Sequence, residues 1–378
     1  MTTTQKTKGA PSLAVDRNVL LEGLQAASRI ASSRTANQAL TGVQLAAGDG
    51  GVELRATDLE LSLRLPLAGD VAAAGEVVLP ARLFADVVRA LPAGVVSIEH
   101  RGATQDVEIK SGSATFDLKT LRSEDFPTLP ASGGETSVSI PAEALDSTVR
   151  RVERAASTDQ TRPVLTGVQF QVDSGVLRMV ATDSYRLSVK ETVLDGAGGD
   201  GFDANVPARA LQEAVRLSQG VEDPVRISLQ DSQVVFDFGG TVLASRLIDG
   251  QFPKWKELVP DKFEHELRIA GEELGDVVRR ISLLAQRTKP LTLAFSKGSL
   301  TISAQTPDIG EARESIPVPF DGEDMEIGFN PDYLRDGIDS AGDGDLVLKL
   351  ISPLRPGLIE SGDGSGFLYL IMPIRLNA

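Results

Sequence analysis

Hydrophobic positions recur at helical spacing at the start of three separate stretches of the chain. In each stretch four apolar residues step by four, three and four positions, which places them on one side of a helix. The sequence therefore predicts three helices, each with one buried face. Their apolar positions are Leu20, Leu24, Ala27 and Ala31; Leu145, Val149, Val152 and Ala156; and Leu274, Val278, Ile281 and Ala285.

Apolar and polar residues then alternate, as in a strand with one buried face. Leucines occupy every second position of residues 59–65, and Tyr185, Leu187 and Val189 repeat this pattern. A second helix is expected to begin at a proline in each stretch, at Pro80, Pro207 and Pro331, because the first turn of a helix needs no proline N–H. More strands are expected at residues 95–98, 225–229, 346–350 and 367–371.

Two sequence segments are repeated at the same distance. Leu40–Gln44 returns residue for residue as Leu165–Gln169, and Ala56–Asp58 returns as Ala181–Asp183, both 125 positions later. A third, more diverged copy lies a further 123 positions along. Solenoid repeats are shorter, about 20 to 50 residues, so three similar globular domains are predicted. We place them at residues 12–130, 135–258 and 259–378, after a mobile tail at residues 1–11.

Composition removes several kinds of chemistry. The chain has no cysteine and only two histidines, His100 and His265, each expected at the surface, which excludes thiol catalysis, disulfides and a Cys/His zinc site. No cofactor or metal is expected. No apolar run approaches the roughly 20 residues that span a bilayer, so we expect no membrane association and a cytoplasmic location.

Asp58 and Asp183 are the best candidates for a catalytic acid or base. Both belong to the repeated Ala-Thr-Asp segment. A catalytic carboxylate has no reason to recur at equal spacing in two domains, whereas an aspartate that forms a turn does. The pattern therefore favours a structural role and a protein that is not an enzyme.

The charge is distributed unevenly. The net charge is −15, which repels DNA on average. The first five predicted helical segments nevertheless hold 15 basic and 11 acidic residues, and only the sixth, residues 329–344, is acidic. The basic residues lie off the apolar stripes and are expected to point away from the sheets. Two interpretations stay open: a solvated surface with local ion pairs, or weak contact with phosphates.

Four segments carry a resemblance to a known family: residues 181–187, 249–253, 326–330 and 372–376. Across residues 12–378 the chain resembles the bacterial DNA polymerase III β subunit, the processivity sliding clamp. The resemblance implies an α+β fold with three clamp domains, and a head-to-tail homodimer that forms a six-domain ring with helices inside and antiparallel sheets outside. The implied function is to encircle double-stranded DNA without sequence specificity and to tether the polymerase α subunit, the clamp loader and other clients.

The resemblance also implies three sets of site residues. A client-peptide groove would be formed by Arg162, Leu165, Thr182, Ser184, Tyr185, Arg186, Leu187, Pro253, Leu258, Leu370, Ile371, Met372, Pro373, Ile374, Arg375 and Leu376. DNA would be faced by Arg34, Arg150, Arg151, Arg154, Gln160, Arg279 and Arg280. The dimer contact would involve Phe116, Leu118, Leu283, Glu311 and Glu314.

The chain departs from the family pattern at a few of these positions. Glu257 stands where a basic residue is familiar, and Tyr185 where histidine is common. Client preference is therefore open. Two alternatives to a housekeeping clamp also remain: a specialised second clamp that resists a clamp-directed inhibitor, and a peptide-binding scaffold that never surrounds DNA.

Overall fold

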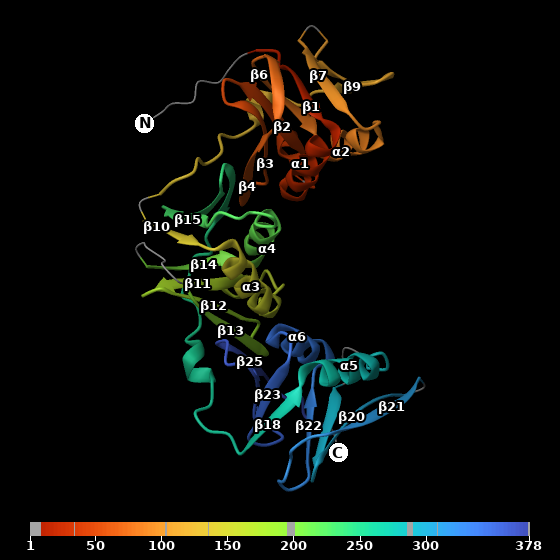
Figure 1. Cartoon of the computed structure of the whole chain (residues 1–378), viewed down its shortest axis with the longest axis vertical. Coiled ribbons are helices and arrows are strands. Elements are labelled where there is room, and N and C mark those ends of the chain that lie inside the picture. The colour runs from red at the N-terminus through yellow and green to blue at the C-terminus, as the bar shows by residue number, and fades with distance from the viewer. Residues whose placement is uncertain are drawn as a thin grey trace. The chain divides into compact units, whose positions relative to one another are not determined.

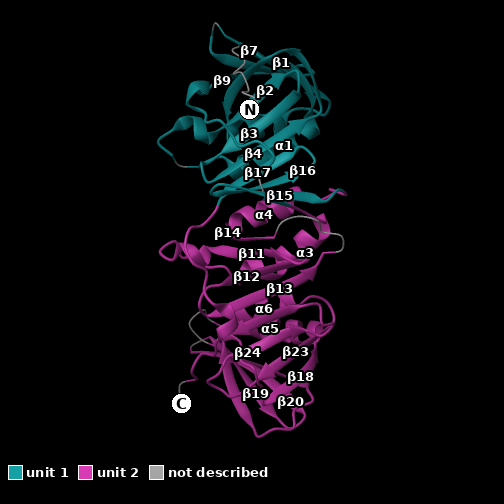
Figure 2. Cartoon of the chain, turned by 90° about the vertical axis from the view of Figure 1, so that its left-hand side faces the viewer, with its two compact units in different colours: residues 1–137, 223–246 teal, residues 138–222, 247–378 magenta. Residues whose placement is uncertain are grey.

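The computed structural model describes residues 9–33, 35–102, 104–134, 136–194, 201–285, 290–307 and 309–376. The chain divides into two compact units (Figure 2). Unit 1 comprises residues 1–137 and 223–246, and unit 2 comprises residues 138–222 and 247–378. Helices and antiparallel strands build both units (Figure 1).

Unit 1 contains helices α1 (Arg17–Ile30) and α2 (Ala81–Ala90). Its five-stranded sheet has the order β5-β1-β7-β8-β9, with β5 (Gly69–Ala73), β1 (Ser12–Asp16), β7 (Val95–Arg101), β8 (Asp106–Ser111) and β9 (Ala114–Lys119). The eight-stranded sheet has the order β10-β15-β16-β17-β4-β3-β2-β6. Its strands are β10 (Thr136–Ile140), β15 (Val225–Gln230), β16 (Gln233–Phe238), β17 (Thr241–Arg246), β4 (Leu61–Leu67), β3 (Gly51–Thr57), β2 (Gly42–Gly48) and β6 (Gly75–Pro80).

Unit 2 contains helices α3 (Ala142–Val152), α4 (Ala208–Leu217), α5 (Gly271–Ser282) and α6 (Pro331–Ala341). One sheet has the order β14-β11-β12-β13-β25-β24-β23-β18, with β14 (Phe202–Pro207), β11 (Gly167–Asp173), β12 (Val176–Thr182), β13 (Arg186–Val193), β25 (Phe367–Ile371), β24 (Gly357–Ser361), β23 (Asp345–Leu350) and β18 (His265–Ala270). The other has the order β21-β20-β19-β22, with β21 (Gly310–Pro317), β20 (Ser299–Thr306), β19 (Leu291–Ser296) and β22 (Met325–Phe329).

The predicted apolar stripes are confirmed, with a correction at their ends. The first three members of each stripe are buried, but the closing alanines, Ala31, Ala156 and Ala285, lie beyond the helices and are only partly buried. The proline prediction is confirmed for α6, where Pro331 is the first residue. Pro80 and Pro207 instead end β6 and β14 and serve as the N-caps of α2 and α4.

The predicted alternation is only partly confirmed: it fails just before β4 and β13, Leu65 is only partly buried, and in β13 the intervening Ser188 and Lys190 are buried as well. Leu61, Leu63, Leu187 and Val189 are buried. Leu59 and Tyr185 were expected on the same buried faces, yet they are 57% and 59% exposed. Each precedes its strand in a tight turn, and Leu59 itself has a φ of 78°.

Neighbouring repeats share a sheet within each unit. In unit 1, β4 of the first repeat pairs with β17 of the second, and Ser62 lies opposite Ala244. In unit 2, β13 of the second repeat pairs with β25 of the third, and Leu187 lies opposite Leu370. We call these strand pairs the first and second junctions. They bring segments of different repeats side by side.

Two predictions, on the N-terminal tail and on the histidines, need correction. Residues 1–8 of the expected mobile tail lie outside the described residues, but Pro11 is buried, and its carbonyl accepts a hydrogen bond from the His100 N–H at 2.9 Å. His100 and His265 are partly buried, contrary to the surface expectation. None of the helices in the described part of the chain could cross a membrane.

Candidate functional site

The repeated Ala-Thr-Asp segment forms a tight turn at the start of β13. Oδ1 of Asp183 accepts hydrogen bonds from the backbone N–H groups of Tyr185 and Arg186, at 2.9 and 3.0 Å. The Thr182 hydroxyl donates to the Arg186 carbonyl at 2.7 Å and accepts from the Ser184 N–H at 3.2 Å. Ser184 takes the left-handed conformation, with a φ of 81°. The prediction that Asp183 forms a turn is thereby confirmed.

Unit 1 contains the same turn at the start of β4. Oδ1 of Asp58 accepts from the N–H groups of Glu60 and Leu61, at 3.0 and 2.8 Å. Thr57 donates to the Leu61 carbonyl at 2.7 Å, as its counterpart does in unit 2. The repeated sequence therefore encodes a repeated local geometry.

The turn in unit 2 lies beside the end of β25. The N–H of Met372 donates to the carbonyl of Tyr185 at 2.9 Å. Met372 is 44% exposed, Tyr185 59% and Leu258 51%, so these three side chains offer accessible surface. They are the exposed large hydrophobic side chains among the described residues of the predicted groove.

Three other predicted lining residues are not accessible. Leu187, Leu370 and Ile371 are at most 4% exposed, so they lie at the floor of the predicted groove and offer almost no surface, and their part in peptide binding stays a prediction. Leu187 and Leu370 pack with Val180 and Phe252 in one hydrophobic cluster, against which Trp255 is packed. These leucines form a floor beneath the turn and hold it in place.

The remaining groove residues take varied positions around the turn. Nη1 of Arg162 donates to Oγ of Ser184 at 3.1 Å, and the Leu165 N–H donates to the Arg162 carbonyl at 3.0 Å. Thr182 is buried by its hydrogen bonds. Pro253 lies on the segment that lines a cavity of about 760 Å³ together with Trp255 and Glu257. The N–H of Ile374 donates to the Gly328 carbonyl at 2.8 Å, which fixes residues 373–376 beside β22.

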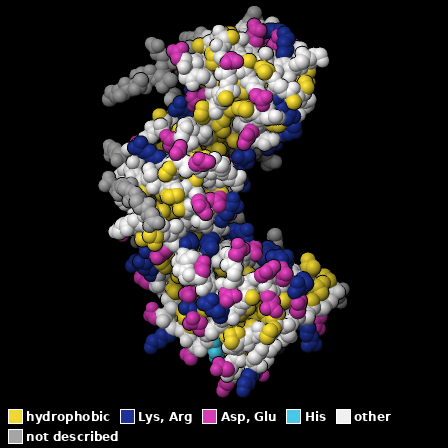
Figure 3. Space-filling model, in the orientation of Figure 1, with side chains coloured by type: hydrophobic (Ala, Val, Ile, Leu, Met, Phe, Trp, Pro, Cys, Tyr) yellow, Lys and Arg dark blue, Asp and Glu magenta, His cyan; other side chains and the backbone are white. Residues whose placement is uncertain are grey.

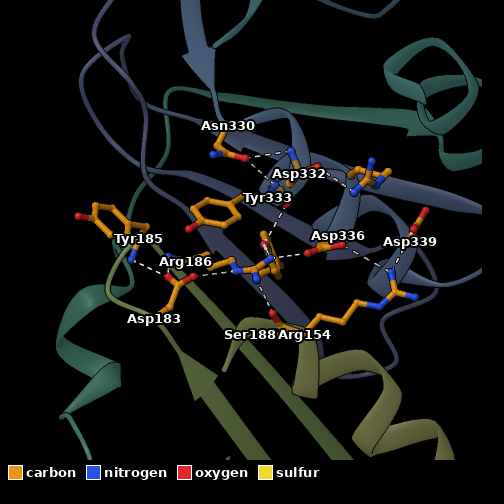
Figure 4. A network of polar contacts seen from close by, with 12 residues as sticks. Arg154, Asp183, Tyr185, Arg186, Ser188, Asn330, Asp332, Tyr333, Asp336 and Asp339 are labelled. Carbon is orange, nitrogen blue, oxygen red and sulfur yellow. Dashed lines mark hydrogen bonds and ion pairs between the residues drawn. The ribbon is translucent and has the colours of Figure 1, made fainter. Parts of the chain in front are cut away.

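Arg186, which the resemblance assigns to the client-peptide groove, is instead mostly buried in a polar network within unit 2 (Figure 4). Its side chain is only 10% exposed. Nε donates to Asp183 at 3.0 Å, Nη1 donates to Asp336 at 2.5 Å, and Nη2 donates to the Arg154 carbonyl. The guanidinium also lies 4.3 Å from the centre of the Tyr333 ring. Each arm of the fork is therefore engaged within unit 2.

The electrostatics of this network favour a permanently charged Arg186. Burial alone would lower the pKa of Arg186, but Tyr369, Asp336 and Asp183 outweigh burial and raise it. Burial also raises the pKa of Tyr369 and of Tyr333. The Tyr369 hydroxyl donates to the Tyr333 carbonyl at 2.9 Å, so it stays protonated as a donor.

Sequence reasoning missed Tyr333 and Asp336. A signal for Asp336 was present, because the segment containing α6 stood out as the one acidic helical segment. The structure supplies the reason: Asp336 and Asp339 lie within 3.7 and 3.1 Å of Arg154, and Asp336 also binds Arg186. The acidic face of α6 complements two arginines of the preceding repeat.

The residues predicted to face DNA are mostly tied to neighbouring groups. Arg150 pairs with Asp146 at 2.7 Å, Arg279 with Asp276 at 2.6 Å, and Arg280 with Glu314 at 2.7 Å. The hydrogen bond from Arg280 lowers the pKa of Glu314. Acidic and basic side chains are correspondingly interspersed on the face drawn in Figure 3.

Three further members of this set differ. Arg151 does not point away from the sheets: its Nη1 donates to Ser361 at 3.0 Å and to Ser365 at 2.9 Å, both at the β24–β25 hairpin. Gln160 is exposed. Arg34 lies outside the described residues, so its role stays a prediction.

The predicted dimer residues lie on or near two sheet edges. β9 is an edge strand of unit 1, and β21 is an edge strand of unit 2. Phe116 on β9 is 38% exposed, and Leu283, just after α5, is 83% exposed. Glu311 on β21 is also exposed, whereas Leu118 is buried and Glu314 is paired with Arg280. A side-chain contact by Leu118 is therefore corrected to a role in the core.

Comparison with known proteins gives one consistent result. Models of the DNA polymerase III beta subunit match the chain at residues 12–130 (N-terminal domain), 139–254 (central domain) and 256–375 (C-terminal domain). The beta sliding clamp of Streptomyces coelicolor is 34% identical over 331 residues, covering 86% of this chain and 87% of its own. That of Synechocystis is 33% identical over 354 residues, covering 88% and 90%.

Solved structures agree with the sequence comparisons. The DNA polymerase sliding clamp of Bacillus subtilis superposes with a TM-score of 0.90 at 29% identity, over 98% of this chain and 100% of that one. The C. crescentus beta sliding clamp also has a TM-score of 0.90, at 28% identity and with the same coverage.

The chain belongs to the DNA polymerase III beta subunit family, the bacterial beta sliding clamps. It has three clamp domains and the fold of known clamp structures, as the resemblance implied. Membership places it among accessory processivity proteins and not among enzymes. The exact domain boundaries, and the roles of individual site residues, stay predictions.

Proposed function

We propose that this chain is a processivity clamp that closes around duplex DNA as a head-to-tail homodimer and tethers a replicative polymerase and other clients. One observation carries the proposal: three clamp-family domains follow one another from residue 12 to residue 375. Two such chains supply the six domains of a ring. The exposed edges of β9 and β21 offer unpaired backbone groups through which two copies would join their sheets.

The charge pattern supports sliding in preference to gripping. Each phosphate that a protein neutralises adds affinity for DNA. It also makes the slope of log K against log salt concentration more negative by about 0.9. Arg150, Arg279 and Arg280 are already paired with carboxylates, so each offers a phosphate only part of its charge. A ring with such a surface is expected to be held on DNA by its closure, with little affinity for any one position. This function implies that duplex DNA is the partner of the chain and that the chain acts in the cytoplasm.

The accessible side chains near the turn of unit 2 support a peptide-binding role. Met372 and Leu258 are apolar and about half exposed, and Leu258 is next in the chain to Val259, which packs against the buried hydrophobic cluster. An unbranched methionine adapts to differently shaped partners. We propose that short clamp-binding peptides of the polymerase α subunit, the clamp loader and other clients insert an apolar residue here.

Retention on DNA distinguishes a clamp from a scaffold. The purified chain would be loaded onto nicked circular DNA by a clamp loader, separated from free protein, and counted before and after linearisation. A clamp stays on circles and is lost from free ends. Equal retention on both forms, or a monomer in sedimentation at micromolar concentration, would contradict the ring.

A peptide-binding measurement tests the groove separately. Met372→Ala should weaken binding of a polymerase clamp-binding peptide by about tenfold or more, which corresponds to roughly 1.4 kcal/mol. The matched control is Leu354→Ala, which removes another apolar side chain that is 65% exposed but is not predicted in the groove. Equal peptide affinities of both variants and the parent chain would overturn the groove assignment. The dimer should persist in both.

A further inference from the structure

A cavity of about 420 Å³ opens beside the first junction, entirely within unit 1. The turn before β4 and the start of β4 form one wall, and residues 127–130 and 230–233 form the others. Ala244 of β17 contributes to its floor and is 2% exposed. The lining residues used below are Leu59, Glu60, Ser62, Asp231 and Ala244.

This cavity occupies the place that corresponds to the floor of the predicted client groove. Leu61 pairs with Ser245 and Ser62 with Ala244 in the first junction, as Arg186 pairs with Ile371 and Leu187 with Leu370 in the second. Both registers follow the same turn. Ser62 and Ala244 thus stand where unit 2 has two leucines, and two smaller side chains leave space where the leucines fill it.

Leu59 adds an independent observation at the mouth of the cavity. It has a φ of 78°, a left-handed conformation that is strained for a residue with a bulky side chain. The same position in unit 2 is a serine, Ser184, with a φ of 81°. Leu59 is also 57% exposed, so its side chain gains little from folding. Backbone strain of this kind clusters at functional positions, and here it holds an apolar side chain beside the cavity.

The charge of the lining points to a cationic occupant. Among the described residues that line it, Glu60 and Asp231 are the charged ones, and none is a lysine or an arginine. Arg246 approaches Glu60 at 3.7 Å, but both side chains are more than half exposed, so their attraction is weak. The turn of unit 2 has the opposite character, because Arg162 binds Ser184 directly.

We propose that this cavity is a second docking site, which takes a short extended peptide segment of a partner protein with an aliphatic side chain next to a lysine or arginine. The aliphatic side chain enters the space above Ser62 and Ala244 and contacts Leu59. The cationic side chain approaches Glu60 and Asp231. The site goes beyond the proposed client groove and does not depend on Met372.

Two eight-residue peptides test the proposal on the full chain. They share one central leucine and otherwise small residues, and they differ only in carrying two lysines or two glutamates beside the leucine. We expect saturable binding of the lysine peptide by fluorescence anisotropy, at least about tenfold tighter than binding of the glutamate peptide and weaker at 0.5 M salt. Equal binding of both peptides, or no binding of the lysine peptide at millimolar concentration, would overturn the proposal.

Two variants locate the binding. Leu59→Ser should weaken the lysine peptide at least about fivefold, and it is expected to fold because Ser184 holds the same backbone geometry. Ser62→Leu should also weaken binding of the lysine peptide at least about fivefold, because the larger side chain fills the cavity. Met372→Ala is the matched control and should leave the lysine peptide unaffected. Unchanged binding by Leu59→Ser and Ser62→Leu, or loss with Met372→Ala, would assign the peptide to another surface.

Two other occupants of the cavity, the chain's own N-terminal residues and a second copy of the chain, can be distinguished from a partner peptide by experiment. If deletion of residues 1–8, which include Lys6 and Lys8, tightens binding of the lysine peptide, the chain's own terminus competes for the cavity and the assignment to a partner is wrong. If Leu59→Ser instead changes the sedimentation of the chain, a second copy occupies the cavity and the proposal is equally overturned.

Discussion

The two Ala-Thr-Asp turns differ mainly at the residue that opens the following strand. In unit 1 this residue is Leu61, which is 3% exposed and serves the core. In unit 2 it is Arg186, which ties the turn to Asp183 and Asp336. The backbone hydrogen bonds around both turns are the same. One local geometry can therefore be held by apolar packing or by a polar network, depending on a single side chain.

The floors of the two junctions differ in the size of their side chains, which are large in unit 2 and small in unit 1. Unit 2 fills its floor with Leu187 and Leu370, whereas unit 1 has Ser62 and Ala244 and a cavity above them. The polar turn thus lies over a filled floor, and the apolar turn borders an open one. The comparison indicates that duplicated geometry fixes where a surface can form, while side-chain volume and charge decide what it accepts.

Removing Arg186 should have the largest effect on stability, because only the turn of unit 2 depends on this side chain. Arg186→Ala leaves Asp183 and Asp336 without their cation in a poorly solvated place, so the free energy of unfolding should fall by about 3 kcal/mol. Urea unfolding followed by circular dichroism measures this. Arg162→Ala is the control: its pair with Asp159 is 42% exposed at both side chains and should change stability by about 0.5 kcal/mol or less. Similar small losses in both variants would show that the network contributes little.

Alkaline pH should weaken unit 2 through Tyr369. Burial raises the pKa of Tyr369 above its ordinary 10.0, so folding favours the protonated hydroxyl. This stabilisation is complete below pH 10 and is lost as the pH rises toward the higher pKa of the folded state, by about 1.4 kcal/mol per pH unit.

Leu243 holds the corresponding register position in unit 1, opposite Leu63, and does not titrate. Between pH 9 and about 11.5, the free energy of unfolding should therefore fall less steeply with pH in Tyr369→Phe than in the parent chain. Unfolding curves recorded across this pH range measure the difference. Identical pH dependence would mean that Tyr369 ionises as readily in the folded state as in the unfolded one.

Double-mutant cycles should sharpen the difference between the turns. Asp183→Asn combined with Arg186→Ala is expected to show a coupling energy of about 1 to 2 kcal/mol, because the two side chains share a charged hydrogen bond at 3.0 Å. Asp58→Asn combined with Leu61→Ala should show coupling within about 0.5 kcal/mol, since leucine offers no polar group. Comparable coupling in the two cycles would mean that the turns are held in the same way.

The smallest effect is expected at the left-handed position. Leu59→Gly should raise the free energy of unfolding by about 0.5 kcal/mol, since glycine adopts a positive φ without the strain of a side chain but loses more entropy on folding. Ser184→Gly provides the matched measurement, and its gain should be no larger. A loss of stability in Leu59→Gly would show that the exposed leucine contributes to the fold.

The helices and six of the strands, β4, β7, β13, β15, β23 and β25, could be predicted because their signal is local. The stripe through Leu20, Leu24 and Ala27 and the alternation through Leu61 and Leu63 depend only on spacing along the chain. Leu59 was misplaced for the same reason: it continues the alternation, but Asp58 bends the backbone before the strand begins. Periodicity does not report a turn that interrupts it.

The site was predicted less completely because its residues meet through tertiary contacts. The family resemblance identified Arg186 and Met372, yet nothing in the sequence shows that Arg186 is buried against Asp336, 150 positions away. Burial likewise separates Leu187 and Leu370 from Met372, although all three are apolar. Partners distant in sequence decide which of these side chains is exposed.

Strand sharing at the junctions has a consequence for any dissection of this molecule. β13 depends on β25 for one row of backbone hydrogen bonds, and β4 depends on β17. A fragment cut between repeats would keep one strand of a junction and lose the strand that pairs with it. The remaining strand would then have an unpaired edge that promotes aggregation. The smallest piece that folds cleanly should therefore exceed one repeat, and exchange of repeats between relatives would succeed only if both strands of a junction travel together.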